Sequence, residues 1–355
     1  MASGKKIEAK VVVMAIGVAP ETTLAKEAAL DIGETGAIKV DQNYRTNDEN
    51  IYAVGDAIEV KHYINGAESL IPLAWPANRQ GRIVADTILG IRQKPYTGSL
   101  GTSILKAFDL TVSATGLNEK TLKRLGIPYM VTTVNRNDHA SYYPGATPLT
   151  LKLIFNKEGD ILGAQAIGYK GVDKRIDIIA TAIKGNLKVW DLQEVEVAYA
   201  PPYNSAKDPV NIAGYAAENM INGEHETFRY FEIDELLQDS NYQLLDVRTK
   251  MENRLGTIKD SINIDVNELR DNLDSLNRDK TYLVFCQVGL RGYLAYRILV
   301  QNGFKVKNLD GGYRLWSHTV QEQENKNIFK EDNFKHKDLN SCEEVKELVD
   351  EEKEV

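Results

Sequence analysis

The stretch GAIKVDQNYRTNDENIYAVGDAIE, residues 36–59, decides the fold that we expect for the first part of this chain. Residues 38–41 alternate between apolar and polar side chains, as in a half-buried strand. Residues 51–54 form an apolar run that is typical of a buried parallel strand. Gly55 and Asp56 then follow at the end where open α/β sheets bind ligands. Gly55 permits close approach to the backbone, and Asp56 can accept hydrogen bonds from hydroxyl groups.

The pattern G-x-I-x-V-D…T…I-Y-A-x-G-D in this stretch resembles the second flavin-binding motif of the pyridine nucleotide-disulfide reductase family. The resemblance implies that Asp56 binds the ribityl chain of FAD and that Gly55 lies beside it. The alternative is a strand-turn-strand of another α/β protein, in which Asp56 is a turn residue. The many positions that match in register favour the flavin interpretation.

The next segment, PLAWPANRQGRIVADTILG, predicts a helix that begins near Pro76, Ala77 and Asn78 and carries Val84 and Ile88 on one face. The free N–H groups and partial positive charge of a helix N-terminus suit a reduced flavin, whose pyrimidine ring becomes anionic. The resemblance implies that Ala77 and Asn78 contact the flavin ring. The alternative is an ordinary capped surface helix.

Composition and charge limit the classes of function. At 355 residues the chain is long enough for two or three domains. A net charge of −8 gives no basic surface for nucleic acid or an anionic membrane, and 43% hydrophobic residues indicate a folded protein. Cys286 and Cys342 have no CxxC spacing, so neither a disulfide framework nor a metal site is expected. This cysteine usage fits a reducing, cytoplasmic compartment.

The N-terminus superficially resembles a signal peptide, because lysines precede an apolar run at residues 11–19. However, Glu8 interrupts the basic region, no small-residue cleavage site follows, and the run is too short to span a membrane. We expect residues 7–16 to form a buried strand.

Residues 1–20 resemble the strand by which this reductase family returns from its NAD domain to its FAD domain. In the family, two G-x-G-x-x-G motifs and a redox cysteine precede this strand. None occurs in this sequence; the glycine cluster at residues 163–168, GAQAIG, lacks the middle glycine. The resemblance therefore implies the C-terminal part of a longer enzyme, without the turn that holds the FAD pyrophosphate.

From residue 101 to residue 223 the pattern changes to antiparallel strands and two helices. We expect strands at 102–112 and 149–155, a hairpin turn at 156–160 and a helix at 172–183. The segment resembles the dimerisation domain of the same reductases. This resemblance implies a homodimer in which each active site is completed by the partner subunit.

Two stretches, HASYYPGA (139–146) and EVEVAYAPPYNSAKDPVN (194–211), resemble the coenzyme A-disulfide reductase branch. The resemblance implies that Tyr142 and Tyr199 reach across the dimer to the coenzyme A substrate. A phenol can hydrogen-bond a pantetheine amide or a thiolate. The alternative is that these tyrosines only pack at an interface. Tyr143 and Tyr203 would replace them in a shifted register.

After a polar linker at 222–227, strands and helices alternate over residues 228–320, which predicts a small parallel sheet. Strands are expected at 243–247, 283–285 and 306–309, and a helix at 294–300. The strand at 283–285 leads directly into Cys286.

The loop Cys286-Gln287-Val288-Gly289-Leu290-Arg291 lies between this strand and a helix. Such a loop turns successive backbone N–H groups towards the sulfur and favours the thiolate, or the outer sulfur of a persulfide. We expect Gly289 to permit the curvature and Arg291 to add a fixed positive charge. The alternative is a buried, inert cysteine.

This segment resembles a rhodanese domain, with LLDVRTKMENRLGTI and LDGGYRLW as its signatures. Thr257, where histidine is common, and Asp260-Ser261 depart from the pattern, away from the cysteine. Related phosphatases have seven residues from cysteine to arginine, whereas this chain has the six that suit sulfur. We expect an ion pair of Asp246 and Arg248 to orient the loop.

The sequence thus predicts α/β and α+β domains: part of a doubly wound FAD/NAD-binding domain (1–97), an α+β dimerisation domain (98–223), a rhodanese-like α/β domain (228–320) and a charged tail (321–355). The order resembles coenzyme A-disulfide reductases with a fused rhodanese domain. It implies reduction of coenzyme A disulfide, coenzyme A persulfide or polysulfide with FAD and NADH, and Cys286 as sulfur carrier. The alternative is a dimeric sulfurtransferase or an interaction scaffold without reductase activity.

Overall fold

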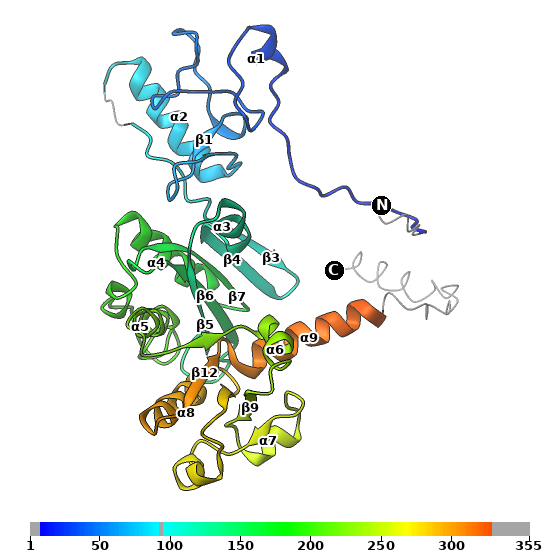
Figure 1. Cartoon of the computed structure of the whole chain (residues 1–355). Helices are drawn as coiled ribbons and strands as arrows, with labels where there is room; N and C mark the ends of the chain where they lie inside the picture. The colour runs from blue at the N-terminus through cyan, green and yellow to red at the C-terminus, as the bar shows by residue number, and fades with distance from the viewer. Residues whose placement is uncertain (1–7, 92–94, 329–355) are drawn as a thin grey trace, which may run out of the picture. The chain divides into compact units, whose positions relative to one another are not determined.

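The computed structural model describes residues 8–91 and 95–328, with side chains described through residue 320. The chain divides into two compact units, Met1–Glu224 and His225–Val355, which have separate hydrophobic cores (Figure 1). The division falls within the polar segment 222–227.

The first ninety or so residues of the first unit, at the blue end of the colour bar in Figure 1, contain little regular structure. Its elements are α1 (Thr23–Glu27), the 3-10 turn η1 (Gly55–Ala57), the two-residue strands β1 (Val60–Lys61) and β2 (Glu68–Ser69), and α2 (Ala74–Ile88). A small core is made by residues that include Tyr44, Ile58 and Ile83. Because Ile58 follows η1 and Ile83 lies on α2, this core packs the Gly55 turn against α2.

The strands predicted in this segment do not form. Residues 38–41 and 51–54 take part only in isolated bridges, such as Ile38 with Ile58 and Arg45 with Tyr52. Of the predicted strand at 7–16, the described residues 8–16 are exposed and not in a strand, and residue 7 lies outside the described range. A strand needs a neighbour that pairs its N–H and C=O groups along its length, and the described segments provide only single bridges here.

Helix α2 begins at Ala74, two residues before the predicted start. Its buried face carries Gln80, Ile83 and Thr87, whereas Ile88 is 59% exposed. Val84 is partly buried and packs against the small core, so the predicted face holds at Val84 and fails at Ile88.

The rest of the first unit is built on a five-stranded antiparallel sheet in the order β3-β4-β7-β6-β5. The strands are β3 (Ser103–Ala107), β4 (Leu110–Gly116), β5 (Met130–Asn137), β6 (Pro148–Phe155) and β7 (Ile161–Gly168). The strand predicted at 102–112 is in fact two strands, because Phe108 at φ 53° turns the chain between them. The hairpin turn at 156–160 is confirmed: the N–H of Asn156 donates to Asp160 O at 3.1 Å.

Three α-helices accompany this sheet rather than the two predicted: α3 (Glu119–Leu125), α4 (Val172–Lys184) and α5 (Pro209–Ile221), with the 3-10 turn η2 (Asp191–Gln193). Helix α4 confirms the prediction at 172–183. The apolar residues of α4 and α5 pack on alternate residues of β6, such as Leu149, Leu151 and Leu153, while Ile154 faces the core of α3. The sheet is therefore packed on α4 and α5 on one face of β6, and on the core of α3 at the Ile154 end of the other face.

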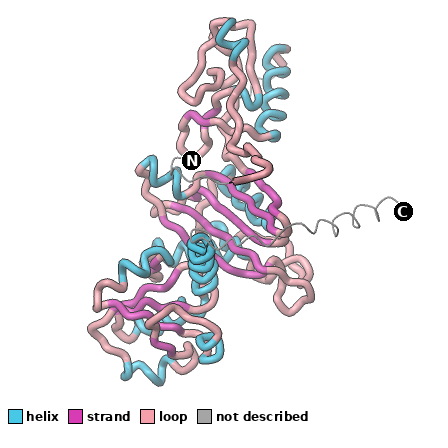
Figure 2. The backbone as a smooth tube through the Cα atoms, turned by 90° about the vertical axis from the view of Figure 1, so that its right-hand side faces the viewer, coloured by secondary structure: helices cyan, strands magenta, loops and turns pink. Residues whose placement is uncertain are grey.

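The second unit confirms the predicted parallel sheet (Figure 2). Its order is β10-β9-β11-β12-β8, and every pairing is parallel. The strands are β8 (Thr227–Phe228), β9 (Tyr242–Asp246), β10 (Ile262–Asn263), β11 (Thr281–Phe285) and β12 (Lys305–Leu309). The helical elements are η3 (Tyr230–Glu232), α6 (Ile233–Leu236), α7 (Lys250–Arg254), η4 (Leu269–Ser275), α8 (Leu290–Gln301) and α9 (Gly312–Ile328).

Both faces of this sheet are buried. Along β11, Tyr282 and Val284 point to the core that contains α8 and η4, whereas Leu283 and Phe285 point to the core that contains α6 and α9. This alternation is the period of a strand, and it sends the next residue, Cys286, towards the α8 side. Of the predicted charged tail, residues through 328 belong to α9, and the rest, including Cys342, lie outside the described residues.

Candidate active site

Cys286 lies at the carboxyl end of the central strand β11, immediately before the loop that leads to α8. Its side chain is fully buried. Helix α8 begins at Leu290, and Gly289 precedes it at φ 113°, a conformation that favours glycine. The structure thus places the cysteine at the helix N-terminus, as the sequence predicted.

The N–H of Gly289 donates to the sulfur of Cys286, with N···Sγ 3.1 Å. Among the described residues the sulfur thus accepts from one backbone N–H, whereas we expected several successive N–H groups to point towards it. A donor aimed at sulfur favours negative charge there, which is the form that attacks another sulfur. The loop can therefore support a nucleophilic thiolate.

The start of α9 fastens the loop from its other side. The N–H groups of Tyr313 and Arg314 donate to the carbonyl oxygens of Cys286 and Gln287 at 2.8 and 3.0 Å. Gly312 has φ 63°, and a Cβ there would lie 2.7 Å from the carbonyl oxygen of Cys286. Gly312, the second glycine of the LDGGYRLW signature, therefore lets the start of α9 lie directly against the backbone of the cysteine loop.

The positive charge of Arg291 is held in place by an acidic partner that we did not predict. Its guanidinium forms two hydrogen bonds with the carboxylate of Glu252, at 2.6 and 2.7 Å. This pairing lowers the pKa of Glu252 to about 2 and raises the pKa of Arg291. Glu252 is also the N3 residue of the capping box of α7, where it accepts from Thr249. The arginine charge is thus oriented, and partly neutralised, by α7.

Asp246 and Arg248 form the predicted ion pair, with both side chains buried and Nη2···Oδ2 2.7 Å. Arg248 also donates to the side-chain oxygen of Gln287 at 3.1 Å, and its guanidinium lies 4.0 Å from the ring centre of Tyr313. The pair therefore holds the cysteine loop and the start of α9 together. Thr257, the departure from the rhodanese pattern, donates to Asp246 at 3.0 Å and so supports the pair.

Tyr142 and Tyr199 lie together although 57 residues separate them. Their hydroxyl oxygens are 3.2 Å apart, and both side chains are exposed. The hydrogen bond raises the pKa of Tyr142. Of the two residues held in reserve, Tyr143 contacts the ring of His139, and Tyr203 is 73% exposed. Two phenols at one point form a polar surface that can bind an amide or a thiolate.

A buried arginine that sequence reasoning missed supports the two tyrosine loops. Arg175 of α4 donates from Nη2 to the carbonyl oxygen of Asp138 and to Oδ1 of Asn204, each at 2.9 Å, and from Nε to the carboxylate of Asp208 at 3.1 Å. Asp138 precedes the loop of Tyr142, and Asn204 follows that of Tyr199. Nothing in the local sequence of α4 signals this role. Glu252, also missed, had a signal in the D-V-R-x-x-x-E signature.

Gly55 and Ala77, two of the four predicted flavin residues, lie close together. Gly55 has φ 81°, and a Cβ there would lie 3.9 Å from the Cβ of Ala77. The Gly55 N–H donates to Gln80 of α2 at 2.6 Å. Asp56 is exposed, and Asn78 donates to the carbonyl oxygen of Ala74 at 2.9 Å. The N-cap residue of α2, Leu73, has no side-chain hydrogen bond to the first turn. These features fit the ring and ribityl end of FAD; the described residues hold no counterpart for its pyrophosphate.

The described residues contain no group of three or more His, Cys, Asp or Glu side chains arranged for a metal ion. Every helix in residues 8–91 and 95–328 is too short or too polar to cross a membrane.

Three family comparisons match the chain. Residues 1–81 match the pyridine nucleotide-disulphide oxidoreductases, residues 102–209 their dimerisation domain, and residues 232–319 the rhodanese-like domain. A Staphylococcus epidermidis protein named coenzyme A disulfide reductase is 37% identical over 217 residues, which are 61% of this chain and 49% of that protein. A Staphylococcus aureus protein of the same name is 38% identical over 218 residues, again 61% and 49%. The chain spans about half the length of these curated relatives.

Two solved structures are similar across most of the chain. Reduced CoADR-RHD of Bacillus anthracis is 54% identical with a TM-score of 0.87, over 90% of this chain and 57% of that one. A NAD-dependent persulfide reductase from A. fulgidus is 41% identical with a TM-score of 0.82, over 89% and 57%.

Proposed function

We propose that this chain serves in the reduction of coenzyme A disulfide, coenzyme A persulfide or polysulfide, with Cys286 as the sulfur carrier. The proposal follows because the chain belongs to the pyridine nucleotide-disulphide oxidoreductase family and carries a rhodanese-like domain after the dimerisation domain. The names of the two relatives with solved structures support these substrates. The observation that carries the proposal is the six-residue loop in which Gly289 donates to the sulfur of Cys286.

The proposed sulfur step is a displacement at sulfur. The Cys286 thiolate attacks the outer sulfur of a donor such as thiosulfate, the donor's S–S bond breaks, and sulfite leaves with the electron pair. The product is the persulfide Cys286–S–S⁻, whose outer sulfur a second nucleophile then removes. Gln287, Val288, Gly289 and Leu290 form the wall of the loop, and Arg291, held by Glu252, supplies positive charge at its end. The burial of Cys286 implies that neighbouring side chains move to admit the donor.

FAD, NADH and coenzyme A are the proposed cofactors and substrate of the reductase. When bound, FAD would pass two electrons from NADH to the disulfide or persulfide. Gly55, Asp56, Ala77 and Asn78 fit its ring and ribityl end, whereas the residues that would hold the pyrophosphate are not among those described.

The chain is proposed to act as a homodimer, on the support of its dimerisation domain. Tyr142 and Tyr199 would bind coenzyme A for the partner subunit, since their joined hydroxyl groups face solvent. The proposed domain limits are 1–97 for the FAD/NAD-binding part, 98–223 for the dimerisation domain and 228–320 for the rhodanese-like domain. The cysteine usage supports a cytoplasmic location.

A second candidate function is a dimeric sulfurtransferase, or an interaction scaffold, without reductase activity. The observation that favours it is the Cys286 loop itself, in which Gly289 donates to the sulfur. A visible flavin spectrum and a cyanide–thiosulfate assay separate the candidates. Yellow protein with NADH turnover supports the reductase; colourless protein whose thiocyanate formation is abolished by Cys286→Ser supports the sulfurtransferase. If the assay gives no thiocyanate, or if Cys286→Ser leaves it unchanged, the proposed role of Cys286 is wrong.

A further inference from the structure

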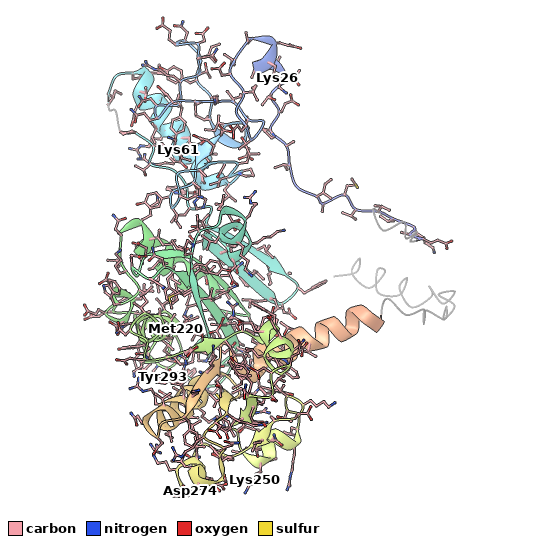
Figure 3. All side chains as sticks on the ribbon, in the orientation of Figure 1. Lys26, Lys61, Met220, Lys250, Asp274 and Tyr293 are labelled. Atoms are coloured by element: carbon pink, nitrogen blue, oxygen red, sulfur yellow. The ribbon has the colours of Figure 1, made fainter. Side chains whose placement is uncertain are left out.

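His225, the first residue of the second unit, lies beside Asn308 on strand β12. The ring nitrogen Nε2 and the side-chain nitrogen Nδ2 of Asn308 are 3.0 Å apart. In this orientation of the amide its nitrogen donates, so Nε2 is the acceptor and the neutral ring carries its proton on Nδ1. The rings of Tyr293, labelled in Figure 3, and Tyr296 pack against it at 4.9 and 5.3 Å. Burial lowers the pKa of His225 to about 4, which agrees with a neutral ring at pH 7.

Asn308 connects this histidine to the cysteine loop. Its Nδ2 also donates to the carbonyl oxygen of Gly289 at 3.4 Å. The N–H of the same Gly289 donates to the sulfur of Cys286 at 3.1 Å. A continuous series of hydrogen bonds therefore runs from His225 through Asn308 and Gly289 to the reactive sulfur.

Asn308 is closely fitted in this position. Its side chain is buried, and a Cβ on Gly292 in the first turn of α8 would lie 2.2 Å from its Oδ1. Its main-chain N–H donates to the carbonyl oxygen of Glu226, the residue after His225. Because the rest of the side chain is packed, the torsion that remains most free is χ2, the rotation of the amide group of Asn308.

We propose that His225 is a positioning residue for Cys286: by accepting from Asn308, it fixes the amide that holds the Gly289 backbone with its N–H aimed at the sulfur. The reason is that 3.4 Å is a weak hydrogen bond, which alone does not fix an amide. Gly289 has φ 113° and no side chain, and its carbonyl oxygen already accepts the first backbone hydrogen bond of α8 from the N–H of Tyr293 at 2.9 Å. The Asn308 amide therefore adds a second donor to this oxygen and fixes the direction of the peptide. This proposal rests on the proposed sulfur chemistry of Cys286.

The test substitutes the full chain at His225. His225→Phe keeps a ring against Tyr293 and Tyr296 but removes the acceptor. We expect the rate of persulfide formation from thiosulfate to fall about five-fold, as for the loss of one neutral hydrogen bond, with an unchanged KM for thiosulfate. We also expect the pH midpoint of iodoacetamide labelling at the Cys286 peptide to rise, because the thiolate loses its donor.

His225→Gln provides the rescue, because its side-chain oxygen can accept from Asn308, and we expect it to restore most of the rate. His318→Phe is the matched control, since His318 is exposed on α9 of the same unit, and it should behave as the wild type. Asn308→Ala should repeat the loss if His225→Phe does not fold. The proposal is overturned if folded His225→Phe or Asn308→Ala keeps both the wild-type rate and the labelling midpoint, or if His225→Gln is as slow as His225→Phe.

The labelling measurement does not need sulfur transfer. A wild-type protein that forms no persulfide would overturn the proposed function, and the labelling midpoints would still decide the role of His225. Wild-type transfer with unaffected His225 variants would overturn this inference alone.

Discussion

The carboxylate of Glu252 faces the guanidinium of Arg291 through two hydrogen bonds of 2.6 and 2.7 Å, which join α7 to the first turn of α8. Both side chains are about one-third exposed. The pair therefore contributes little to stability, but it fixes where the arginine charge lies relative to the cysteine loop.

Glu252→Gln keeps the shape of the side chain and removes its charge. We expect unfolding at pH 7 to become easier by about 1 kcal/mol or less, because solvent screens the pair. The folded-state pKa of Glu252 is lowered from 4.5 to about 2, so this contribution is present above pH 4.5 and is lost as the pH falls towards 2. Urea unfolding at several pH values should show the difference between wild type and variant closing on acidification. A difference that grows as the pH falls would contradict the ion pair.

The two glycines that border the cysteine loop should respond differently to alanine. Both have positive φ, 113° at Gly289 and 63° at Gly312, so alanine strains the backbone at each by about 1–3 kcal/mol. At Gly289 a Cβ meets nothing within 4 Å, whereas at Gly312 it lies 2.7 Å from the Cys286 carbonyl oxygen. We expect Gly312→Ala to lower thermal stability and the rate of sulfur transfer more than Gly289→Ala. Equal losses in both variants would show that the contact of Gly312 with the loop is unimportant.

The hydrogen bond between Tyr142 and Tyr199 can be measured by titration. It is the main cause that raises the pKa of Tyr142. Tyr199→Phe removes that partner, so the pKa of Tyr142 should move back towards 10. Selective isotope labelling of tyrosine and NMR titration of Tyr142 would follow the shift, with Tyr203→Phe as a control at an exposed tyrosine of the same segment. An unchanged pKa in Tyr199→Phe would mean that the two hydroxyl groups do not meet in solution.

The sequence predicted the second unit well, because its signals are local. Apolar runs before Asp246 and Cys286 mark strands buried on both faces, and a glycine after the cysteine marks the loop that enters a helix. The cysteine, its loop and the Asp246–Arg248 pair were therefore predictable. The partner of Arg291 was harder to predict, since Glu252 is 39 residues away and the pairing depends on where α7 lies.

The first ninety or so residues show the opposite case. Residues 51–54 have the composition of a buried parallel strand, but strand formation depends on neighbouring strands, and the described residues provide only the bridge of Arg45 and Tyr52. Arg175 shows a further limit: its buried contacts join segments 29 to 37 residues away, which no local pattern reports.

The central claim, that Cys286 carries sulfur, is tested most directly by mass spectrometry of the folded protein after thiosulfate treatment. The account predicts one added sulfur atom, about 32 Da, on the peptide that contains Cys286, removable by cyanide and absent in Cys286→Ser. Folded wild-type protein without this adduct, or with the adduct on the Cys342 peptide alone, would contradict the account.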